Sequence, residues 1–403
     1  MKQGTAMTYT FADWTNNIQH SLMRRLNRHF QGLDDFISLA GGLPDPELMP
    51  NQALADAANH ALLNQYSTAL QYGGNRPGLK EHVANLMKER GVECQPDGIE
   101  ITSGGQQCMD LLSRIFLNHG DTVAMADLSY AGVRQASGPL KPNILSIPID
   151  PNHGLDIDFL EQKLKDGVRP KFLYTVVSAH NPVGVTMSLA NRERLMRLAR
   201  QYEMPVLEDD AYGFLEYDGE QLPALTAIDP EWAIYIGSFA KILAPGVRMG
   251  WIIAPEPVLE KVGVAKQMAT LSTSPMSQHI VQNYLDNNDF PAHIAGLRTV
   301  YGRRRDVMMD AIAEHFPAEV TVYRPTGGMF IWAKLPNELD AMDVIKQAAA
   351  EESVGCNPGA AFGTTPADEE KYKSYIRLAF VRYDEAILAD GIARLGRTLK
   401  KLC

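Results

Sequence analysis

Between residues 98 and 255 the sequence alternates short apolar runs with amphipathic stretches, and this alternation limits the possible folds most strongly. Several of the runs are apolar throughout, as is typical of strands that are buried on both faces. Strands that alternate with helices predict an α/β fold around a mostly parallel sheet of seven strands. The seven runs are Ile99–Thr102, Thr122–Ala126, Ile144–Ile149, Phe172–Val177, Pro205–Leu207, Trp232–Ile236 and Trp251–Ala254.

One helix between these runs has a clear beginning. Apolar residues recur at helical spacing from Leu189 to Tyr202, and Ser188 stands where a side chain could cap the first turn. We therefore expect a helix over Leu189–Tyr202, between the fourth and fifth strands.

The pattern changes after about residue 295. A charged helical stretch, Leu297–His315, precedes two strand-like runs, Met329–Leu335 and Ile376–Phe380, and a helical stretch over Glu385–Leu399 follows. A chain of 403 residues has room for one large and one smaller domain. We expect a large domain over residues 46–294, and a smaller α+β domain formed by residues 1–45 and 295–403.

The composition is typical of a globular protein, with 45% hydrophobic and 21% charged residues. The net charge of −10 argues against nucleic acid as a partner, because a phosphate backbone requires a concentrated basic surface. The run Arg303-Arg304-Arg305 is therefore interpreted as a solvated helix face. No apolar stretch is long enough to span a membrane, and residues 1–5 lead into no apolar segment of a signal peptide. Four cysteines without metal-binding spacing favour a cytoplasmic protein with reduced thiols and no metal site.

Polar residues follow several of the predicted strands, at the sheet edge where parallel sheets bind their ligands. Ser103, Asn181 and Asp209 follow three of the strands, and Ser238–Lys241 follows a fourth. The amine of a lysine such as Lys241 can condense with a carbonyl compound, as it does in enzymes that bind pyridoxal phosphate (PLP). The sequence therefore predicts a pocket at this edge, with Lys241 as the candidate to bind PLP.

In this order, the motifs resemble those of fold-type I PLP-dependent aminotransferases of class I and II. The resemblance extends from Ser38 to Leu399. It is closest to the branch of 2-aminoadipate and kynurenine aminotransferases and the aminotransferase domains of MocR-type regulators. It implies the type I fold of PLP-dependent transferases, PLP as the cofactor, and Lys241 as the lysine that forms a Schiff base with PLP. The same lysine would carry the proton between the substrate α-carbon and the cofactor.

The resemblance also assigns the groups around the cofactor ring. Asp209, in Glu208-Asp209-Asp210-Ala211-Tyr212, matches the carboxylate that keeps the pyridine nitrogen protonated. Asp210 is the competing choice, but the family places this aspartate three residues before the tyrosine, which favours Asp209. Tyr212 and Asn181, the latter in an Asn-Pro-x-Gly motif, match the residues that bind the phenolic oxygen. Tyr130 matches the aromatic residue that stacks on the ring.

A third group of residues resembles phosphate ligands. The turn Ser103-Gly104-Gly105-Gln106 resembles the phosphate cup, whose amides and helix N-terminus favour an anion. Ser238 and Arg248 match further ligands of the phosphate. Tyr72 resembles a tyrosine that reaches the phosphate of the neighbouring subunit, which implies a homodimer with shared active sites. The chain departs from the common pattern at Leu128, Val183 and Ala240.

Other residues resemble groups that bind the substrate. Arg377 matches the arginine that binds the α-carboxylate, for which a planar guanidinium group is well suited. Gly42 resembles a residue of the segment that closes over the substrate, where glycine allows a close backbone approach. Asn181 belongs to the same set. A dicarboxylic substrate would need a second cation, for which the candidates are Arg24, Arg25 and Arg134.

These observations predict an aminotransferase of amino acid metabolism that acts in biosynthesis. It would move an amino group from an L-amino acid to a 2-oxo acid by a ping-pong mechanism. The same residues also support a PLP-dependent elimination, decarboxylation, cyclisation or oxidation of an amino acid, because fold and cofactor do not fix the reaction. A PLP-sensing regulator is disfavoured, since residues 1–37 show no recognition-helix pattern and the chain is acidic.

Overall fold

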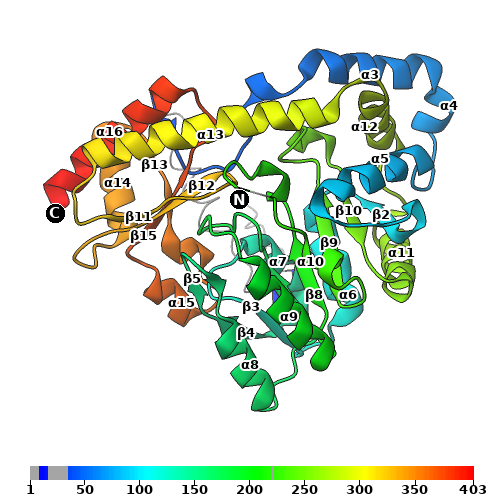
Figure 1. The fold of residues 1–403 in the computed structure, drawn as a ribbon, viewed down its shortest axis with the longest axis horizontal. Helices are drawn as coiled ribbons and strands as arrows, with labels where there is room; N and C mark the ends of the chain where they lie inside the picture. Colours follow the sequence, from blue (N-terminus) through cyan, green and yellow to red (C-terminus); the bar gives the residue numbers. More distant parts are fainter. Residues whose placement is uncertain (1–8, 17–34, 220) are drawn as a thin grey trace, which may run out of the picture.

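The computed structural model describes residues 9–16, 35–219 and 221–403, and a seven-stranded sheet lies at its centre (Figure 1). The order is β2-β10-β9-β8-β7-β3-β4, and only β10 runs antiparallel to its neighbours. This arrangement confirms the predicted α/β fold with a mostly parallel sheet. The strands are β2 (Ile99–Thr102), β3 (Thr122–Ala126), β4 (Asn143–Ile147), β7 (Leu173–Thr175), β8 (Val206–Asp209), β9 (Ala233–Ser238) and β10 (Gly250–Ile253).

One predicted strand, Ile144–Ile149, is divided in the structure. β4 ends at Ile147, and β5 (Ile149–Asp150) leaves the large sheet to pair with β6 (Gly154–Leu155). Pro148 separates the two strands, and a proline has no amide hydrogen to continue a ladder of hydrogen bonds. The apolar run therefore contains the end of one strand and the start of another.

Helices cover both faces of the large sheet. Met125 of β3 belongs to the same apolar cluster as Leu112 of α6 (Gly105–Phe116). Its neighbour Ala124 belongs to a second cluster, which contains Leu195 of α9 (Leu189–Gln201). Successive residues of a strand point to opposite faces, so each face has its own apolar core.

The helix predicted over Leu189–Tyr202 is confirmed as α9 (Leu189–Gln201), and the hydroxyl group of Ser188 accepts the amide hydrogen of Asn191 at 3.3 Å. Several other helices of the large part have no counterpart in the sequence predictions. They include α3 (Asn51–Asn64), α5 (Pro77–Met87), α11 (Glu256–Thr270) and α12 (Pro275–Asn287).

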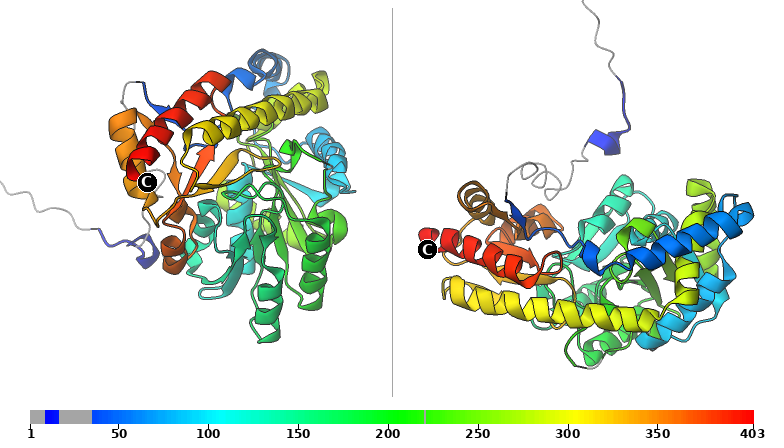
Figure 2. Two further views of the ribbon diagram at one scale, coloured as in Figure 1. Left: turned by 60° about the vertical axis from the view of Figure 1, so that its left-hand side comes forward. Right: turned by 90° about the horizontal axis from the view of Figure 1, so that it is seen from above.

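The C-terminal part contains an antiparallel sheet in the order β11-β12-β15-β14. β1 (Ile37–Ser38) pairs in parallel with β13 (Val354–Gly355), which joins the segment around residue 37 to this part. The long helix α13 packs on α16 and extends to the helices of the larger part (Figures 1 and 2). The domain boundaries at residues 45 and 295 remain a prediction. The other elements are β11 (Thr321–Tyr323), β12 (Phe330–Lys334), β14 (Asn357–Pro358), β15 (Tyr375–Ala379), α13 (Phe290–His315), α14 (Ala341–Glu352) and α16 (Glu385–Leu402).

The interpretation of Arg303-Arg304-Arg305 as a solvated helix face is wrong for two of the three residues. Arg303 is exposed, but Arg304 and Arg305 are buried and form ion pairs of 2.7 Å with Asp45 and Asp218. Consecutive residues of a helix project about 100° apart, so neighbours can meet different surroundings. A guanidinium group can be buried when it is paired in this way.

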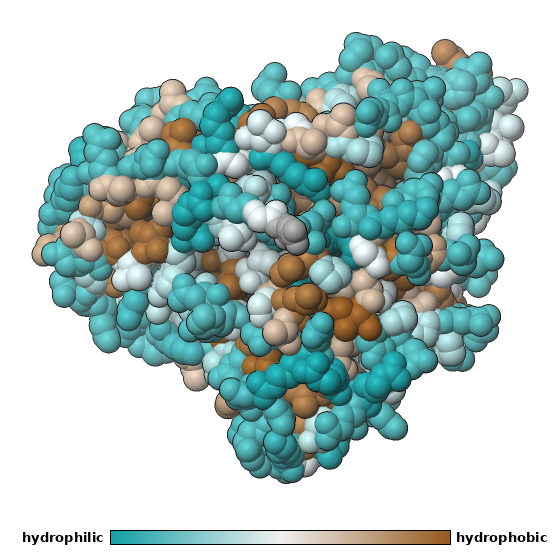
Figure 3. Space-filling view, in the orientation of Figure 1, coloured by the Kyte–Doolittle hydropathy of each residue, from teal (hydrophilic) through white to brown (hydrophobic). Residues whose placement is uncertain are grey.

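The surface of the face drawn in Figure 3 is largely hydrophilic, with apolar side chains in small separate patches. Within the described part of the chain, no helix combines the length and the apolar character needed to cross a membrane.

Candidate active site

A cavity of about 220 Å³ lies at the carboxyl ends of the parallel strands. Its lining includes most of the residues that were assigned from the sequence: Gly105, Gln106, Tyr130, Asn181, Asp209, Tyr212, Ser238, Lys241 and Arg248. Ser103, Gly104, Gly42 and Arg377 lie against these lining residues. The fold thus brings together segments that are far apart in the sequence.

Asp209 is the last residue of β8 and contributes to the cavity lining. Its Oδ2 atom accepts a hydrogen bond of 2.7 Å from the hydroxyl group of Tyr174 in β7. Burial raises the pKa of Asp209 to about 6, against the opposing effects of Tyr174 and Lys241. Such a carboxylate binds a cationic group strongly, because little water competes for it.

Asp210, the competing candidate, has other partners. Its Oδ2 atom accepts hydrogen bonds of 2.8 Å from the buried side chains of Arg90 and Tyr235. Asp209 and Asp210 are adjacent, and adjacent residues at the end of a strand point to opposite faces of a sheet. The geometry therefore favours Asp209 as the carboxylate of the cavity.

Lys241 follows β9, and its Nζ atom donates a hydrogen bond of 2.7 Å to the carbonyl oxygen of Gly42. Burial lowers the pKa of Lys241 to about 8, and the charges of Arg377 and Arg248 also lower it, while Asp209 has the opposite effect. Near neutral pH, a larger fraction of this amine is uncharged than in an ordinary lysine. The uncharged amine is the form that attacks a carbonyl group or accepts a proton.

Arg377 lies in β15 of the smaller sheet and is buried. Its Nη1 atom donates to Oδ1 of Asn181 at 2.8 Å, and its Nη2 atom donates to the carbonyl oxygen of Ala40 at 2.6 Å. Burial lowers the pKa of Arg377 to about 10, and the guanidinium group remains a cation at neutral pH. The amide group of Asn181 also donates to the hydroxyl oxygen of Tyr212 at 3.3 Å.

The turn Ser103–Gln106 connects β2 to α6, and Gly105 and Gln106 of this turn line the cavity. Gly104 has a φ angle of +87°, and a Cβ atom at this position would lie 3.0 Å from Nη2 of Arg248. The same Nη2 atom donates to the carbonyl oxygen of Ser103 at 3.1 Å. The first amides of a helix have no acceptor within the helix, and its N-terminus favours an anion. Arg248 and the start of α6 thus supply donors suited to a phosphate group.

Ser238 lies beside Ala240, one of the positions that depart from the family pattern. The hydroxyl oxygen of Ser238 accepts the amide hydrogen of Ala240 at 3.1 Å, which leaves the hydroxyl hydrogen available for another acceptor. Gln106 is already engaged, because its side-chain amide donates to the carbonyl oxygen of Gly132 at 2.9 Å. This bond holds the side chain beside α7 (Ala131–Ser137), and the backbone amide of Gln106 belongs to the start of α6.

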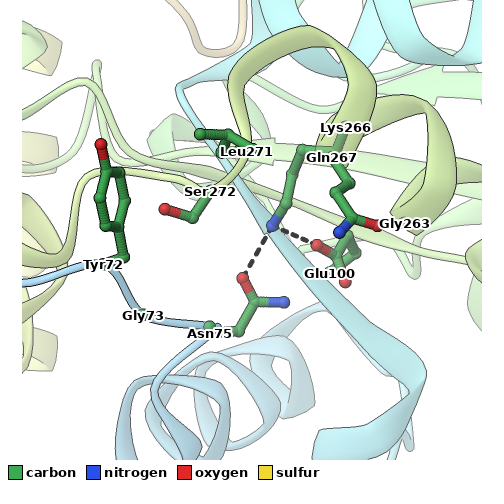
Figure 4. A pocket seen from close by; sticks show the side chains of 10 residues that line it. Tyr72, Gly73, Asn75, Glu100, Gly263, Lys266, Gln267, Leu271 and Ser272 are labelled. Atoms are coloured by element: carbon green, nitrogen blue, oxygen red, sulfur yellow. Dashed lines mark hydrogen bonds and ion pairs between the residues drawn. The ribbon is translucent and has the colours of Figure 1, made fainter.

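Tyr72 lies away from this cavity within one chain. It is 80% exposed and lines a separate hollow of about 700 Å³, together with Asn75, Glu100 and Lys266 (Figure 4). The amine of Lys266 donates to Oδ1 of Asn75 at 2.9 Å and pairs with Glu100, so this wall of the hollow is held by its own side chains.

Arg24 and Arg25, two of the candidates for a second substrate cation, lie outside the described residues. Arg134, the third, belongs to α7 (Ala131–Ser137), which begins directly after Tyr130. Its Nη2 atom lies 3.5 Å from the carbonyl oxygen of Ala361, and its Nη1 atom lies 3.9 Å from Glu369. Burial lowers its pKa, while Glu369 and Asp368 oppose this shift. Within the described residues, Arg134 thus has only long contacts, to Ala361 and Glu369, and is not among the residues that line the cavity.

Three contributors to the site were missed in the sequence. Phe330 of β12 and Phe362 place their rings 3.8 Å and 4.6 Å from the guanidinium group of Arg377, where their faces attract the cation. Tyr174 was included in a predicted strand but received no role. No motif marks any of the three, because their importance comes from contacts between distant segments.

The residues of the cavity fit the chemical groups of PLP. Asp209 offers an anion to a pyridine nitrogen, Lys241 offers an amine to an aldehyde, and Arg248 with the start of α6 offers donors to a phosphate group. The raised pKa of Asp209 means that the nearby cations do not offset its burial. A protonated ring nitrogen would supply the missing positive charge.

This fold and this cavity are those of a PLP-dependent enzyme of fold type I, and comparison with known proteins defines the family. The model of aminotransferase class I and II matches residues 34–395, so the chain belongs to this family. The chain is 38% identical to aromatic-amino-acid aminotransferase 1 of Thermococcus litoralis, over 91% of this chain and 88% of the relative. It is 36% identical to the 2-aminoadipate transaminase of Thermus thermophilus, over 97% of each protein.

A solved structure shows the same relationship. The kynurenine aminotransferase of Pyrococcus horikoshii, determined in complex with PMP, superimposes with a TM-score of 0.90 over 97% of each chain, at 36% identity. The protein is therefore a PLP-dependent aminotransferase, as the sequence predicted.

Proposed function

We propose that Lys241 binds PLP covalently, that Asp209 pairs with its ring nitrogen, and that Arg248, Ser238 and the turn Ser103–Gln106 bind its phosphate group. One observation carries this assignment. Lys241, Asp209 and Arg248, from three separate segments, meet at one cavity, and burial shifts the pKa of Lys241 and of Asp209 toward the uncharged form. When bound, PLP supplies an electron sink for the negative charge that develops as the α-proton leaves.

The amine of Lys241 accepts the α-proton at Nζ and returns it during the reaction. Its lowered pKa supports this role, because a general base is most effective when its pKa is close to the working pH. Tyr212 and Asn181 bind the phenolic oxygen of the cofactor. Burial raises the pKa of Tyr212, so its hydroxyl group stays a donor at neutral pH. Tyr130, at the start of α7, stacks on the ring.

Arg377 binds the α-carboxylate of the amino donor, and Asn181 orients its guanidinium group through the hydrogen bond of 2.8 Å. The Nε atom of Arg377 has no hydrogen-bond partner within the described part of the chain, which leaves a donor for the substrate. Gly42 belongs to the segment over this site, next to Phe330. The named relatives act on aromatic amino acids, 2-aminoadipate and kynurenine, and these are the first amino donors to test.

A homodimer with shared active sites completes the proposal. Tyr72 is 80% exposed within one chain. Large apolar side chains that are close to it in the sequence, or that lie beside its hollow, are also exposed. These are Tyr66, Leu70, Met268 and Leu271, each more than 60% exposed. A second subunit that covers this surface would bury them and bring Tyr72 to the phosphate site of the partner.

The remaining proposals concern organisation and location. We divide the chain into a large domain of residues 46–294 and a small domain of residues 1–45 and 295–403, which the pairing of β1 with β13 supports. The four cysteines, all within the described residues, are free thiols, which supports a cytoplasmic enzyme. We also propose a role in amino acid biosynthesis.

A half-reaction experiment tests the proposed function. Purified holoenzyme is mixed with single L-amino acids, and the absorbance of the cofactor is recorded. Conversion to the pyridoxamine form, with one equivalent of 2-oxo acid released and reversal by an added 2-oxo acid, supports transamination through this site. Release of ammonia or carbon dioxide without a reversible half-reaction would contradict it.

A further inference from the structure

Two consecutive aspartates at the end of β8 each accept a hydrogen bond from a different buried tyrosine. The hydroxyl group of Tyr174 donates to Oδ2 of Asp209 at 2.7 Å, and the hydroxyl group of Tyr235 donates to Oδ2 of Asp210 at 2.8 Å. Both tyrosines are almost fully buried. Only Asp209 belongs to the lining of the active-site cavity.

The register of the sheet explains this arrangement. Tyr174 in β7 is paired with Leu207 in β8, and Leu207 lies on the same face of the strand as Asp209, two residues later. Tyr235 in β9 is paired with Glu208, whose face of the sheet is the opposite one. Each tyrosine therefore reaches the aspartate on its own face, and Tyr174 is the one that meets the cavity side.

We propose that Tyr174 is a positioning residue for transamination, which holds the carboxylate of Asp209 ionised and correctly oriented toward the ring nitrogen of PLP. The inference rests on the proposed role of Asp209. Nothing in the family motifs discussed above assigns Tyr174, which touches Asp209 and acts through it. The hydrogen bond has a neutral donor and an anionic acceptor, a combination that is stronger than a bond between neutral groups.

Burial and Asp210 both disfavour a negative charge on Asp209. The groups with the largest effects on its carboxylate are Tyr174 from β7, Asp210 from its own segment and Lys241 from the turn after β9. Tyr130, Tyr212 and Cys108 also interact with it, and burial raises the pKa of each, so they stay uncharged at neutral pH. Asp210 repels a negative charge on Asp209, and the amine of Lys241 loses part of its own charge through burial. Tyr174 remains a donor throughout the physiological range, because burial and Asp209 raise its pKa well above the ordinary value.

The expected consequence concerns the position of one proton between two groups. With Tyr174 present, the carboxylate is ionised and the ring nitrogen keeps the proton. Without the hydrogen bond the carboxylate becomes more basic, and the same proton moves toward Asp209, which leaves the ring nitrogen closer to neutral. A neutral ring withdraws electrons less strongly, so the rate of α-proton removal falls while the binding of the α-carboxylate is unchanged.

The test compares Tyr174→Phe with Tyr235→Phe as a matched control. Both variants remove one hydroxyl group from a buried tyrosine in the same sheet, next to one of two adjacent aspartates. Each holoenzyme is prepared with PLP labelled with 15N in the ring, and three quantities are measured: the 15N chemical shift of the ring nitrogen, the dissociation constant of PLP, and kcat and KM separately. Thermal unfolding of each variant reports the purely structural cost.

For Tyr174→Phe we expect a 15N shift toward the value of an unprotonated ring, PLP binding weaker by on the order of 10-fold, and a lower kcat with an unchanged KM. Tyr235→Phe should reduce the unfolding temperature similarly and leave the 15N shift unchanged. Equal 15N shifts in the two phenylalanine variants, or no shift in Tyr174→Phe, would overturn the proposal.

Two further samples keep the outcome interpretable. A fluorinated tyrosine at position 174 has a more acidic hydroxyl group, so it should strengthen the hydrogen bond and leave the ring nitrogen at least as fully protonated as in the wild type. This sample serves if Tyr174→Phe does not fold, and a shift toward the unprotonated value would then overturn the proposal. Asp209→Asn tests the underlying assignment. If its 15N shift equals that of the wild type, the role of Asp209 is wrong. If Asp209→Asn changes the shift and Tyr174→Phe does not, only the role of Tyr174 is wrong.

Discussion

Nη1 of Arg377 lies 2.8 Å from Oδ1 of Asn181, although Arg377 belongs to β15 of the smaller sheet and Asn181 lies in the turn that follows β7 of the larger sheet. Asn181 also donates to Tyr212, so a continuous set of hydrogen bonds connects the proposed carboxylate site to the proposed cofactor site. The position of the substrate relative to the cofactor therefore depends on how these two sheets are placed.

Arg377→Ala should raise KM for every α-amino acid by roughly 10²-fold, because a buried charge-assisted contact to the carboxylate is lost. Arg377→Lys should recover part of this loss, since lysine keeps the charge but not the planar pair of donors. Steady-state kinetics with amino acids and with amines that lack a carboxylate provide the measurement. An equal effect on both kinds of substrate would assign the carboxylate to another group.

Lys241→Ala should remove the absorbance band of the covalently bound cofactor and lower turnover by roughly 10⁴-fold, the upper end of the usual effect of a general base. Lys346→Ala is the control, because that lysine is exposed and no role in binding or catalysis is assigned to it. Absorbance spectra and single-turnover rates give the comparison. Turnover within 10-fold of the wild type in Lys241→Ala would refute the assignment.

Removal of the cofactor should reveal the burial of Asp209 in the pH dependence of stability. The pKa of Asp209 is about 6 in the folded state and 3.8 ordinarily, so between these pH values the folded protein binds a proton that the unfolded chain does not. The unfolding free energy contributed by this group is therefore greatest below pH 3.8 and falls as the pH rises to 6, by about 3 kcal/mol.

Denaturant unfolding of the cofactor-free protein across this pH range, compared with Asp209→Asn, isolates the contribution. The difference in unfolding free energy between wild type and variant should change with pH in the stated direction. A pH-independent difference would mean that Asp209 titrates normally in the folded protein.

Gly42→Ala should impair the closure of the N-terminal segment over the site. A Cβ atom at position 42 would lie 2.4 Å from Cζ of Phe330, and a displacement of this kind typically costs about 1–3 kcal/mol. Phe330→Leu should relieve the contact. The double variant should therefore lose less unfolding free energy than the sum of the losses in the two single variants. A double-mutant cycle of unfolding free energies with zero coupling would show that the contact is absent.

Tyr72→Ala and Lys241→Ala should complement each other if each active site takes Tyr72 from one subunit and Lys241 from the other. Each protein alone should be nearly inactive. After unfolding and refolding of an equal mixture, hybrid dimers should each contain one intact site, which restores about a quarter of wild-type activity. Failure of the mixture to exceed the activity of its parts, when hybrids are demonstrably present, would place Tyr72 in its own subunit's site.

The sequence predicted the large sheet well because its strands are buried on both faces and appear as apolar runs, such as Thr122–Ala126. It failed at Pro148, where an apolar run crosses a strand boundary, and at Arg304 and Arg305, whose ion pairs involve residues far away in the chain. The sequence predicted those cavity residues that belong to a recognisable motif directly after a strand. Tyr174 was missed because its partner, Asp209, is brought close only by strand pairing.

The carbonyl oxygens of Ala40 and Gly42 accept hydrogen bonds from Arg377 and Lys241, the two groups that we assign to the substrate carboxylate and the α-proton. One short piece of main chain thus contacts both groups through backbone oxygens, which every amino acid provides. These contacts depend on the path of the chain and not on the side chains at positions 40 and 42. Substitutions there that keep the path of the main chain should therefore keep both hydrogen bonds.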